Sequence, residues 1–423
     1  AVIERELIGG ECAYWACVPS KTLLRPPEAR TAAARAAGVN GAELNWAEAS
    51  DYRDYMIRHL DDKAQIDDYN GQGATVIKAE ATITGPGRLQ AGGKSIHADH
   101  IIIATGSEAV VPELDGAENI TTWTNRETFT ATTLPRRAVV IGGSAVGTET
   151  ATFLAGFGVD VTLVHRGENL LEREEPRVGE LARLYLQEAG VKVRLGSQAV
   201  RARRNGNGSS VELDDGTSVS ADVLIFATGR KPRSKDLGFE SAGVELGPSG
   251  AVLIDEHCRA AENVWAIGDV TAVMPFTHVA KYQGRIVADA ILGHPRPATY
   301  DGIPRVVFGD PEIAAAGLTQ AQADEQGLST AFAELDLAQS LARPWTYERE
   351  PRGHLGLLTD TDKGTLIGAW AVSPLAGEWI HQASLAIRAR IPIAVLHDQV
   401  AQFPSYSEAF QAALDTLKYR KET

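Results

Sequence analysis

Long hydrophobic runs are missing from this sequence, because no apolar stretch approaches the roughly 18 residues that a membrane helix requires. A membrane-spanning protein is therefore excluded. Positive charge is also scarce: 41 Lys and Arg residues face 55 Asp and Glu residues, and the net charge of −14 disfavours nucleic acids and anionic membranes as main partners. The 3 cysteines are too few for a secreted disulfide framework, and no signal peptide is recognisable. We therefore expect a reducing, cytoplasmic location.

Glycine, by contrast, is abundant, with 41 residues that cluster beside apolar, strand-like runs. The 423 residues exceed what one hydrophobic core supports, and a prior of about 150 residues per domain predicts two or three domains. The sequence has no initiator Met and opens inside an apolar strand at residues 1–4. We expect the first part of a domain to precede residue 1.

Strands and helices alternate along the first 300 residues. Residues 1–25 read as strand, glycine turn and helix, and a complete strand–helix–strand unit covers 138–164. Apolar strands at 101–103 and 223–226 both end in Ala-Thr-Gly, which suggests two related nucleotide-binding units. We also expect a helix over 52–64. From residue 303 the pattern changes to antiparallel-looking strands at 305–308, 353–359 and 365–372, with helices at 377–388 and 407–417.

The glycine turn after residue 141 has the context of a dinucleotide fingerprint, since it follows a strand and opens a helix. Its residues are Gly142, Gly143, Ser144, Ala145, Val146 and Gly147, in which Ser144 replaces a glycine. Glycines allow a pyrophosphate to approach the backbone at a helix N-terminus. At the end of the following strand, His165 and Arg166 stand where a carboxylate would hold the ribose of NAD, so they suit the 2′-phosphate of NADPH. The alternative is that Arg166 is an exposed loop residue.

Two cysteines five residues apart, Cys12 and Cys17, lie between a glycine pair and Pro-Ser-Lys at the expected start of a helix. They can form a disulfide if that turn is distorted, and the helix N-terminus and Lys21 favour a thiolate. The alternative is a pair of buried, inert cysteines.

Two acidic residues end apolar strands in the manner of dinucleotide-binding units. Glu4 ends the opening strand, and Asp269 follows the strand at 263–267, where its carboxylate can hydrogen-bond a cofactor polyol. An exposed turn Asp is the alternative. Cys258 is isolated and reads as a small core residue, and the histidines lack metal-ligand spacing, so no metal site is expected.

Together these segments resemble the FAD-dependent pyridine nucleotide–disulfide oxidoreductases, which include lipoamide dehydrogenase, glutathione reductase and mercuric reductase. The resemblance covers the whole chain in order. It rests on Gly-Gly-x-Cys-x4-Cys-x-Pro-Ser-Lys at residues 9–21, Ala-Thr-Gly at 104–106 and 227–229, Gly268-Asp269, and Phe-Gly-Asp-Pro-Glu at 308–312.

The resemblance implies roles for particular residues. Cys17 would lie against the flavin, Cys12 would face the substrate, and Lys21 near flavin N5 would pair with Glu149 beside the nicotinamide. Glu408 would belong to the acid–base motif of the C-terminal domain, and Asp269 would hold the flavin ribityl chain. The implied cofactor-binding positions also include Glu4, Gly10, Glu11, Ala81, Ala104, Thr105, Gly106, Gly229, Arg230, Gly268, Thr277 and His278.

Several positions depart from the family pattern. The FAD glycine loop has no counterpart in the sequence, and Ala145 replaces the aromatic that often gates the nicotinamide pocket. The acid–base histidine is Phe403, in Phe-Pro-Ser-Tyr-Ser-Glu at 403–408. No cysteine follows Cys258, so the C-terminal dithiols of mercuric reductase are not matched.

The sequence thus predicts an α/β homodimer with two Rossmann-like domains and a C-terminal α+β dimerisation domain. The expected boundaries are 1–132 with 260–300 for FAD, 133–259 for NAD(P), and 301–423 for dimerisation. NADPH, or else NADH, would reduce FAD, and electrons would pass through Cys12 and Cys17, or directly, to a small quinone-like acceptor. A dihydrolipoamide dehydrogenase-type enzyme and a non-catalytic nucleotide-binding protein are the alternatives.

Overall fold

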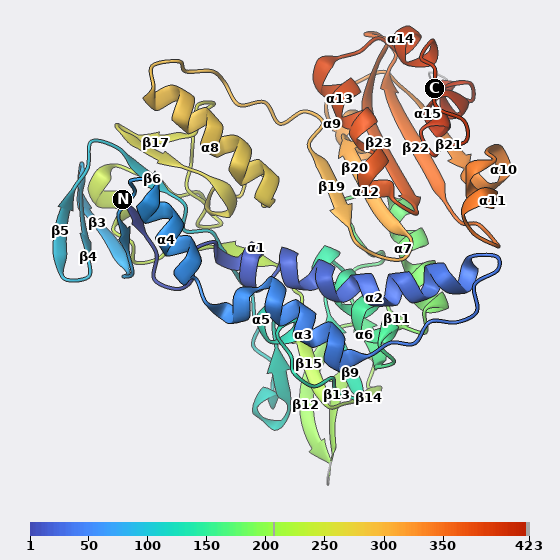
Figure 1. The fold of residues 1–423 in the computed structure, drawn as a ribbon, viewed down its shortest axis with the longest axis horizontal. Coiled ribbons are helices and arrows are strands. Elements are labelled where there is room, and N and C mark those ends of the chain that lie inside the picture. Colours follow the sequence, from blue (N-terminus) through green and yellow to red (C-terminus); the bar gives the residue numbers. More distant parts are fainter. Residues whose placement is uncertain (206–207, 420–423) are drawn as a thin grey trace. The chain divides into compact units, whose positions relative to one another are not determined.

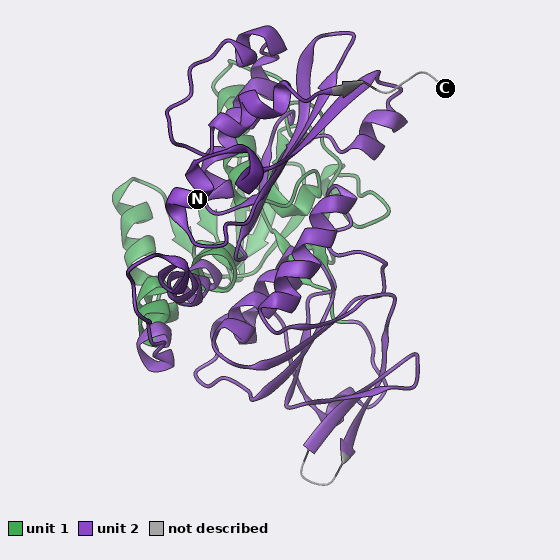
Figure 2. Cartoon of the chain, turned by 90° about the vertical axis from the view of Figure 1, so that its right-hand side faces the viewer, with its two compact units in different colours: residues 1–19, 51–111, 229–299 green, residues 20–50, 112–228, 300–423 purple. Residues whose placement is uncertain are grey.

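The computed structural model describes residues 1–205 and 208–419 and divides into two compact units, neither of them continuous in sequence (Figure 2). Unit 1 comprises Ala1–Pro19, Asp51–Val111 and Gly229–Thr299, and unit 2 comprises Ser20–Ser50, Pro112–Thr228 and Tyr300–Thr423. The chain passes from one unit to the other five times, and two of these passages lie inside helices, α2 (Cys17–Arg35) and α3 (Trp46–Met56).

Unit 1 consists of small sheets and short helices around an apolar core formed by residues such as Ile103, Val252, Val264 and Val270 (Figure 1). The parallel pair β6–β18 continues into β17, and β3, β4 and β5 form an antiparallel sheet. The paired strands β7 and β16 follow the two Ala-Thr-Gly segments. Its elements are β1 (Val2–Ile3), α1 (Gly10–Tyr14), α4 (Lys63–Gly71), β2 (Val76–Ile77), β3 (Ala81–Gly85), β4 (Arg88–Ala91), β5 (Lys94–His97), β6 (Ile101–Ile103), β7 (Ser107–Ala109), β16 (Arg230–Pro232), β17 (Arg259–Ala261), β18 (Val264–Ala266) and α8 (Thr277–Ile291).

The first part of unit 2 is a five-stranded parallel sheet in the order β11-β10-β9-β15-β8. The inner residues of its central strands, such as Val139, Val161, Leu163 and Leu224, are fully buried, as expected when helices cover both faces. A three-stranded antiparallel sheet, β12-β13-β14, accompanies it. The elements are β8 (Thr121–Trp123), α5 (Asn125–Phe129), β9 (Arg137–Ile141), α6 (Ala145–Gly156), β10 (Asp160–Val164), α7 (Pro176–Glu188), β11 (Lys192–Arg194), β12 (Ala199–Asn205), β13 (Gly208–Leu213), β14 (Ser218–Ala221) and β15 (Val223–Phe226).

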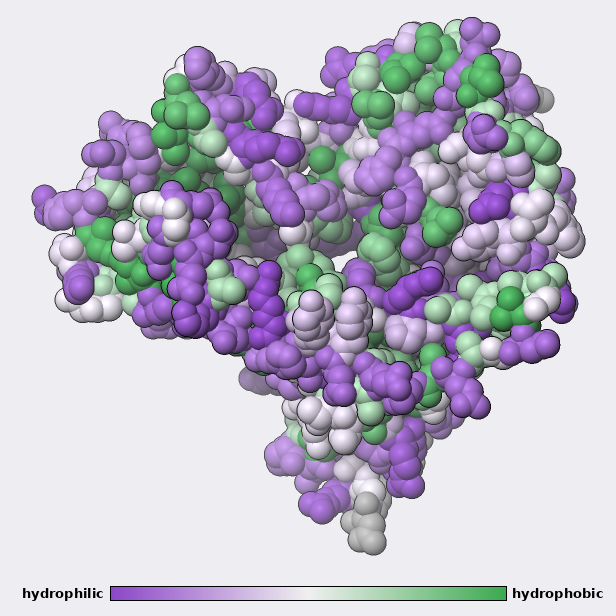
Figure 3. Space-filling model, in the orientation of Figure 1, coloured by the Kyte–Doolittle hydropathy of each residue, from purple (hydrophilic) through white to green (hydrophobic). Residues whose placement is uncertain are grey.

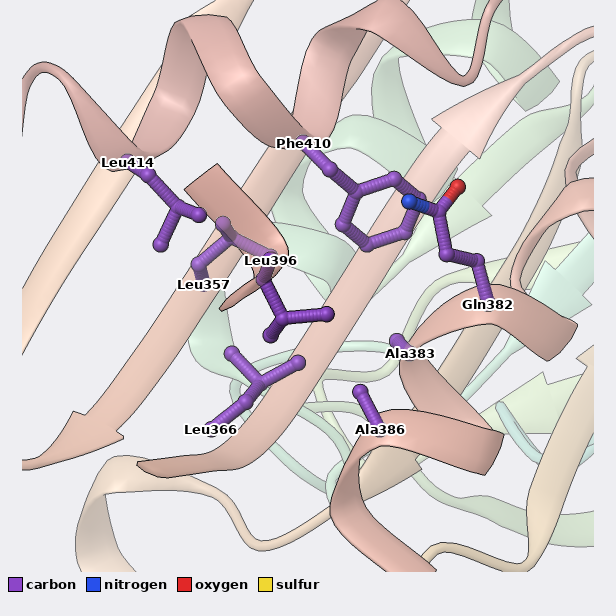
Figure 4. A pocket seen from close by; sticks show the side chains of 8 residues that line it. All are labelled: Leu357, Leu366, Gln382, Ala383, Ala386, Leu396, Phe410 and Leu414. Atoms are coloured by element: carbon purple, nitrogen blue, oxygen red, sulfur yellow. The ribbon is translucent and has the colours of Figure 1, made fainter. Parts of the chain in front are cut away.

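The second part of unit 2 is a six-stranded sheet in the order β19-β20-β23-β22-β21-β24, antiparallel throughout. Helices α13 and α15 pack on it around a small apolar cavity of about 10 Å³, into which the side chains in Figure 4 point. The elements are β19 (Pro304–Val307), β20 (Glu312–Gly317), α9 (Gln320–Glu325), β21 (Thr330–Asp336), α10 (Leu337–Ser340), α11 (Arg343–Tyr347), β22 (His354–Asp360), β23 (Thr365–Ser373), α12 (Ala376–Trp379), α13 (His381–Ala389), α14 (Ile393–His397), α15 (Glu408–Leu414) and β24 (Lys418–Tyr419).

The expected fold class is confirmed: nucleotide-binding α/β units are combined with an antiparallel C-terminal domain. The single helix expected over 52–64 is wrong, because α3 ends at Met56 and α4 begins at Lys63. Between them Arg58, His59 and Leu60 adopt positive φ angles of 55°, 51° and 59°, and left-handed residues cannot continue a right-handed helix.

Cys258 is fully buried and packs with Trp265, Ile286 and Val287, as expected for a small core residue. Among the helices of the described residues, none combines the length and the hydrophobicity that crossing a bilayer demands.

Candidate active site

The glycine turn of unit 2 connects β9 to α6 and has no room for side chains. A Cβ on Gly142 would lie 2.3 Å from the carbonyl oxygen of Ala227, and one on Gly147 would lie 1.9 Å from that of Gly142. Ser144, which replaces a glycine, donates its hydroxyl to Ala227 at 3.0 Å and gives α6 no side-chain cap. The first backbone amides of this 12-residue helix therefore have no side-chain acceptor, and they can donate hydrogen bonds to a phosphate.

His165 and Arg166 follow β10 at the same edge of the sheet. The ring of His165 packs against the turn, since a Cβ on Gly143 would approach it to 2.8 Å, and its Nε2 atom lies 3.6 Å from Glu172. Arg166 is exposed.

Lys21 and Glu149 form an ion pair within unit 2. The Lys21 Nζ atom lies 2.9 and 2.7 Å from the two carboxylate oxygens, and the Glu149 side chain is only 7% exposed. Glu149 also accepts the amide of Phe308 at 3.0 Å, and Nζ lies 4.7 Å from the centre of the Phe308 ring. A buried carboxylate thus has its lone pairs satisfied from α2 and from the end of β19.

Cys12 and Cys17 are half-buried in unit 1 and lie near disulfide-bonding distance of each other. Cys12 is on the short helix α1, whereas Cys17 is the first residue of α2. The Cys17 sulfur lies 3.5 Å from the hydroxyl of Thr277, the first residue of the 15-residue helix α8. Either atom can be the donor in this contact, and the dipole of a helix favours a thiolate over a thiol at its N-terminus.

Asp269 follows β18 and accepts a hydrogen bond from Ser107 at 2.6 Å. Arg230 donates to the Ser107 hydroxyl at 2.7 Å and to its carbonyl at 2.8 Å, and lies 3.7 Å from Glu11. The two Ala-Thr-Gly segments are thereby connected, because Ser107 follows the first and Arg230 the second. Unit 1 thus brings together Glu11, Asp269, Arg230 and the turn at 104–106.

Other expected cofactor residues of unit 1 have local roles. Glu4 accepts the amide of Glu6 at 2.7 Å, and Ala81 begins β3, where it pairs with Ala91. The ring of His278 stacks on Phe276 at 5.2 Å between centres.

The segment that replaces the acid–base motif belongs to unit 2. Phe403 is 67% exposed, whereas Tyr406 is buried and stacks on Trp379 at 6.1 Å between ring centres. Burial, followed by the charge of Glu348, raises the pKa of Tyr406 well above its ordinary value. The Glu408 carboxylate accepts the amide of Ser405 at 2.8 Å.

Comparison with known proteins identifies the chain. The model of the family "Pyridine nucleotide-disulphide oxidoreductase" matches residues 1–284, and that of the family's dimerisation domain matches residues 303–414. The chain belongs to this family. It is 32% identical over 428 residues to a mercuric reductase of Staphylococcus aureus, with 99% of this chain and 78% of that protein covered. It is 30% identical over 421 residues to a glutathione reductase of Burkholderia cepacia, with 97% and 92% covered.

A solved structure supports the same assignment. The HOCl-induced flavoprotein disulfide reductase RclA of Escherichia coli superposes with a TM-score of 0.86 at 26% identity, covering 98% of this chain and 93% of that one. Family members are NAD(P)H-dependent flavoprotein oxidoreductases with FAD. The non-catalytic alternative is therefore not retained, and the expected enzyme class and cofactors are confirmed.

The residues present fit both cofactors of this pyridine nucleotide–disulfide oxidoreductase. The uncapped start of α6 suits the pyrophosphate of NAD(P)H. In unit 1 a Cβ at Gly10 or Gly106 would meet no atom within 4 Å, so the backbone there is accessible to a ligand, and Asp269 is held at the end of its strand.

The sequence analysis missed Ser107, Arg233 and the Phe308 amide. Ser107 and Arg233 follow the two Ala-Thr-Gly segments closely, which was an available signal. Their partners could not be deduced, because the pairing of β7 with β16 joins residues more than 100 positions apart.

Proposed function

We propose that this chain is an NADPH-preferring, FAD-dependent homodimeric reductase in which Cys12 and Cys17 form the redox pair, and that its acceptor is a small, weakly polar molecule of the quinone type. The observation that carries the choice of acceptor is the segment at 403–408. It offers an exposed phenyl ring at the position where this family's histidine would exchange a proton.

The preference for NADPH rests on Arg166. It follows His165, whose ring packs against the glycine turn, and its exposed side chain has no hydrogen-bond or ion-pair partner among residues 1–205 and 208–419. A 2′-phosphate would supply one, and charge-assisted contacts of this kind are worth about 1.5–3 kcal/mol.

The protein would hold each cofactor through groups already described. The pyrophosphate of NADPH would take the α6 amides, and the flavin would be held by Asp269, Gly10 and the turn at 104–106. When bound, the flavin supplies transfer of a hydride from the nicotinamide and of electrons onward. Lys21 and Glu149, paired in unit 2, would orient the nicotinamide ring, and in unit 1 the N-terminus of α8 with Thr277 would favour the thiolate of Cys17.

Proton transfer distinguishes the possible acceptors. Reducing a disulfide substrate releases a thiolate that must be protonated, which a positioned histidine achieves with a gain of about 10²–10⁴ in rate. Phe403 cannot titrate, and the raised pKa of Tyr406 removes the neighbouring phenol as a base at neutral pH. A quinone needs no such thiol proton transfer, and an aromatic side chain suits its flat ring.

The cysteine pair favours a second candidate. Two half-buried cysteines near bonding distance also suit a dithiol/disulfide enzyme of the dihydrolipoamide dehydrogenase type. In that case another group would have to replace the histidine.

The test compares turnover of the wild type with a benzoquinone, dihydrolipoamide and glutathione disulfide. We expect quinone turnover to exceed the others by about 100-fold, consistent with the missing acid–base group. Phe403→His should raise disulfide turnover about tenfold or more, whereas Phe403→Leu, the matched control, should not. Wild-type turnover of a small disulfide at the quinone rate would refute the proposed acceptor.

Homodimer formation is part of the proposal and is supported by the match of residues 303–414 to the dimerisation domain. Hydrophobic side chains gather over the part of the surface that carries α13 and α14 (Figures 1 and 3). Leu385 on α13 and Val395 on α14 are 63% and 58% exposed in the single chain. A partner subunit would cover such side chains.

A further inference from the structure

Arg305 on β19 of the dimerisation domain and Glu174 in the first part of unit 2 form a bidentate ion pair. The Nε and Nη2 atoms of Arg305 donate to the two carboxylate oxygens of Glu174, both at 2.8 Å. The Nη1 atom donates to the carbonyl of Gly317 at 3.1 Å, and the two side chains are 18% and 13% exposed. Two parallel contacts fix the direction of a guanidinium as well as stabilising it, so this pair holds Glu174 in one position relative to β19.

Glu174 lies near the end of the loop 165–175, which connects β10 to α7 and contacts the glycine turn. The Glu174 amide donates to the carbonyl of Leu171 at 2.8 Å, and the Leu171 amide donates to the carbonyl of Gly143 at 2.9 Å. The side chain of Leu170 packs at the same point, since a Cβ on Gly143 would approach it to 2.7 Å. Successive hydrogen bonds thus connect β19, the loop and the turn.

The carbonyl of Gly143 belongs to the same peptide group as the amide of Ser144. Because a trans peptide is planar and its C=O and N–H bonds point in opposite directions, the bond from Leu171 also sets the direction of the Ser144 N–H. Within residues 1–205 and 208–419 this amide donates to no acceptor. A pyrophosphate at the start of α6 would accept it, so the orientation of this peptide should affect the affinity for the dinucleotide.

Two further contacts join the dimerisation domain to the segments that adjoin the turn. Phe308, which follows β19, donates its amide to Glu149 on α6 at 3.0 Å. Glu175 accepts the amide of Gln320, the first residue of α9. Since these contacts remain when Arg305 is replaced, its loss should loosen the loop rather than unfold it.

We propose that Arg305 is a positioning residue for the dinucleotide: through Glu174 and the loop it holds the Gly143–Ser144 peptide in the orientation that binds the pyrophosphate. The inference rests on the proposed function, which places the pyrophosphate at the start of α6. It goes beyond that function by assigning part of the nucleotide affinity to the dimerisation domain, which does not contain the turn.

The experiment measures binding of NADP+, NAD+ and 2′-AMP to the full-length protein with FAD bound, by isothermal titration calorimetry. Arg305→Gln should raise the dissociation constants of NADP+ and NAD+ about three- to tenfold, since both contain the pyrophosphate. The constant for 2′-AMP, which has the 2′-phosphate but no pyrophosphate, should not change. In turnover the KM for NADPH should rise and kcat should stay the same, a result that partial unfolding would not produce.

Glu174→Gln removes the same ion pair from the side of the loop and separates orientation from charge. Arg305→Gln leaves a carboxylate that would repel the nucleotide phosphates, whereas Glu174→Gln leaves a guanidinium that would attract them. A purely electrostatic effect therefore has opposite signs in the two variants, and that result would overturn the inference. We expect both variants to weaken binding, and the double variant to bind no more weakly than Arg305→Gln, because one pair is lost in each case. If Arg305→Gln does not fold, the sign found for Glu174→Gln still decides.

Arg177→Gln is the matched control. Arg177 on α7 pairs with Glu334 on β21 at 2.9 Å, so this pair also joins the first part of unit 2 to the dimerisation domain, but it lies beyond the loop. Its loss should leave all three dissociation constants unchanged. Weakening of NADP+ binding equal to that of Arg305→Gln would refute a specific role for Arg305.

Arg166→Ala keeps the inference separate from the proposed function. If this variant binds NADP+ as tightly as the wild type, the proposed placement of the nucleotide fails, and the inference fails with it. If Arg166→Ala weakens NADP+ binding but Arg305→Gln and Glu174→Gln bind NADP+ and NAD+ as the wild type does, the inference alone is overturned.

Discussion

Single charged side chains determine the chemistry expected of this reductase, and their effect depends on whether a partner is present. Glu149 is buried and paired with Lys21, and the half-buried Glu11 is paired with two arginines. Arg166 is a cation without such a partner among the described residues. The paired side chains should therefore affect the stability of the protein and the position of the groups they hold, whereas Arg166 should affect the affinity for the nucleotide.

Arg166→Ala tests the role of the unpaired cation. We expect the KM for NADPH to rise about tenfold or more, because charge-assisted contacts to the 2′-phosphate are lost, and the KM for NADH to stay unchanged. Steady-state kinetics with each nucleotide measure this. Arg183→Ala is the control, since Arg183 on α7 donates to Gln187. Equal effects on NADPH and NADH would contradict the assignment.

Asp62 tests a paired charge through pH. Burial alone would raise its pKa, but the bonds from Lys78 at 2.6 Å and from the Ile8 amide at 2.8 Å prevail and lower it. A lowered folded-state pKa stabilises the protein above the unfolded pKa of about 3.9 and loses this effect as pH falls through the folded value.

Asp62→Asn should therefore lower stability by about 1–3 kcal/mol at pH 7, with a difference that shrinks below about pH 4. Thermal unfolding across this pH range measures it. Asp67→Asn, in an exposed pair with Lys63, should have little effect at any pH. A difference for Asp62→Asn that stayed constant down to pH 3 would rule out this origin.

At the scale of elements, turns and packing decide where each segment stops. In the β9–α6 connection, backbone carbonyl oxygens occupy the places where a Cβ on Gly142 or Gly147 would lie, so glycine is required at both positions. The antiparallel sheet of unit 2, by contrast, packs against α13 and α15 with a small cavity between them, shown in Figure 4. Because the side chains around this cavity are already closely packed, they cannot easily move to fill the space left by a shortened side chain.

Leu357→Ala on β22 tests this packing. Leu357 is 3% exposed and lines the cavity, so the substitution should cost about 2–5 kcal/mol of stability. Thermal or denaturant unfolding measures the loss. Leu184→Ala on α7, where the side chain is 44% exposed, should change stability by less than about 0.5 kcal/mol. Equal losses for both variants would show that burial at Leu357 is not the cause.

At the scale of the whole molecule, the chain forms two units from interleaved segments and carries a dimerisation domain. We expect a homodimer in sedimentation, with the 403–408 segment of one subunit completing the site of the other. Leu385→Glu combined with Val395→Glu should shift the protein to monomers and abolish acceptor reduction, because two carboxylates would have to be desolvated. Leu184→Glu is the control. A fully active monomer would contradict the composite site.

The sequence by itself determined the family, the cofactors and most elements, because these depend on local patterns. Glycines that permit a phosphate to approach, alternating apolar strands and the spacing of Cys12 and Cys17 are all visible in short segments. The break in the helix expected over 52–64 was not visible in the sequence. It depends on a left-handed backbone at three residues, none of which is a glycine that would have signalled it. The partners of Arg233, Ser107 and Glu11 were decided only by the tertiary structure. An ion pair acts over a few ångströms whatever the separation along the chain, and only the folded backbone brings β7, β16 and α1 that close together.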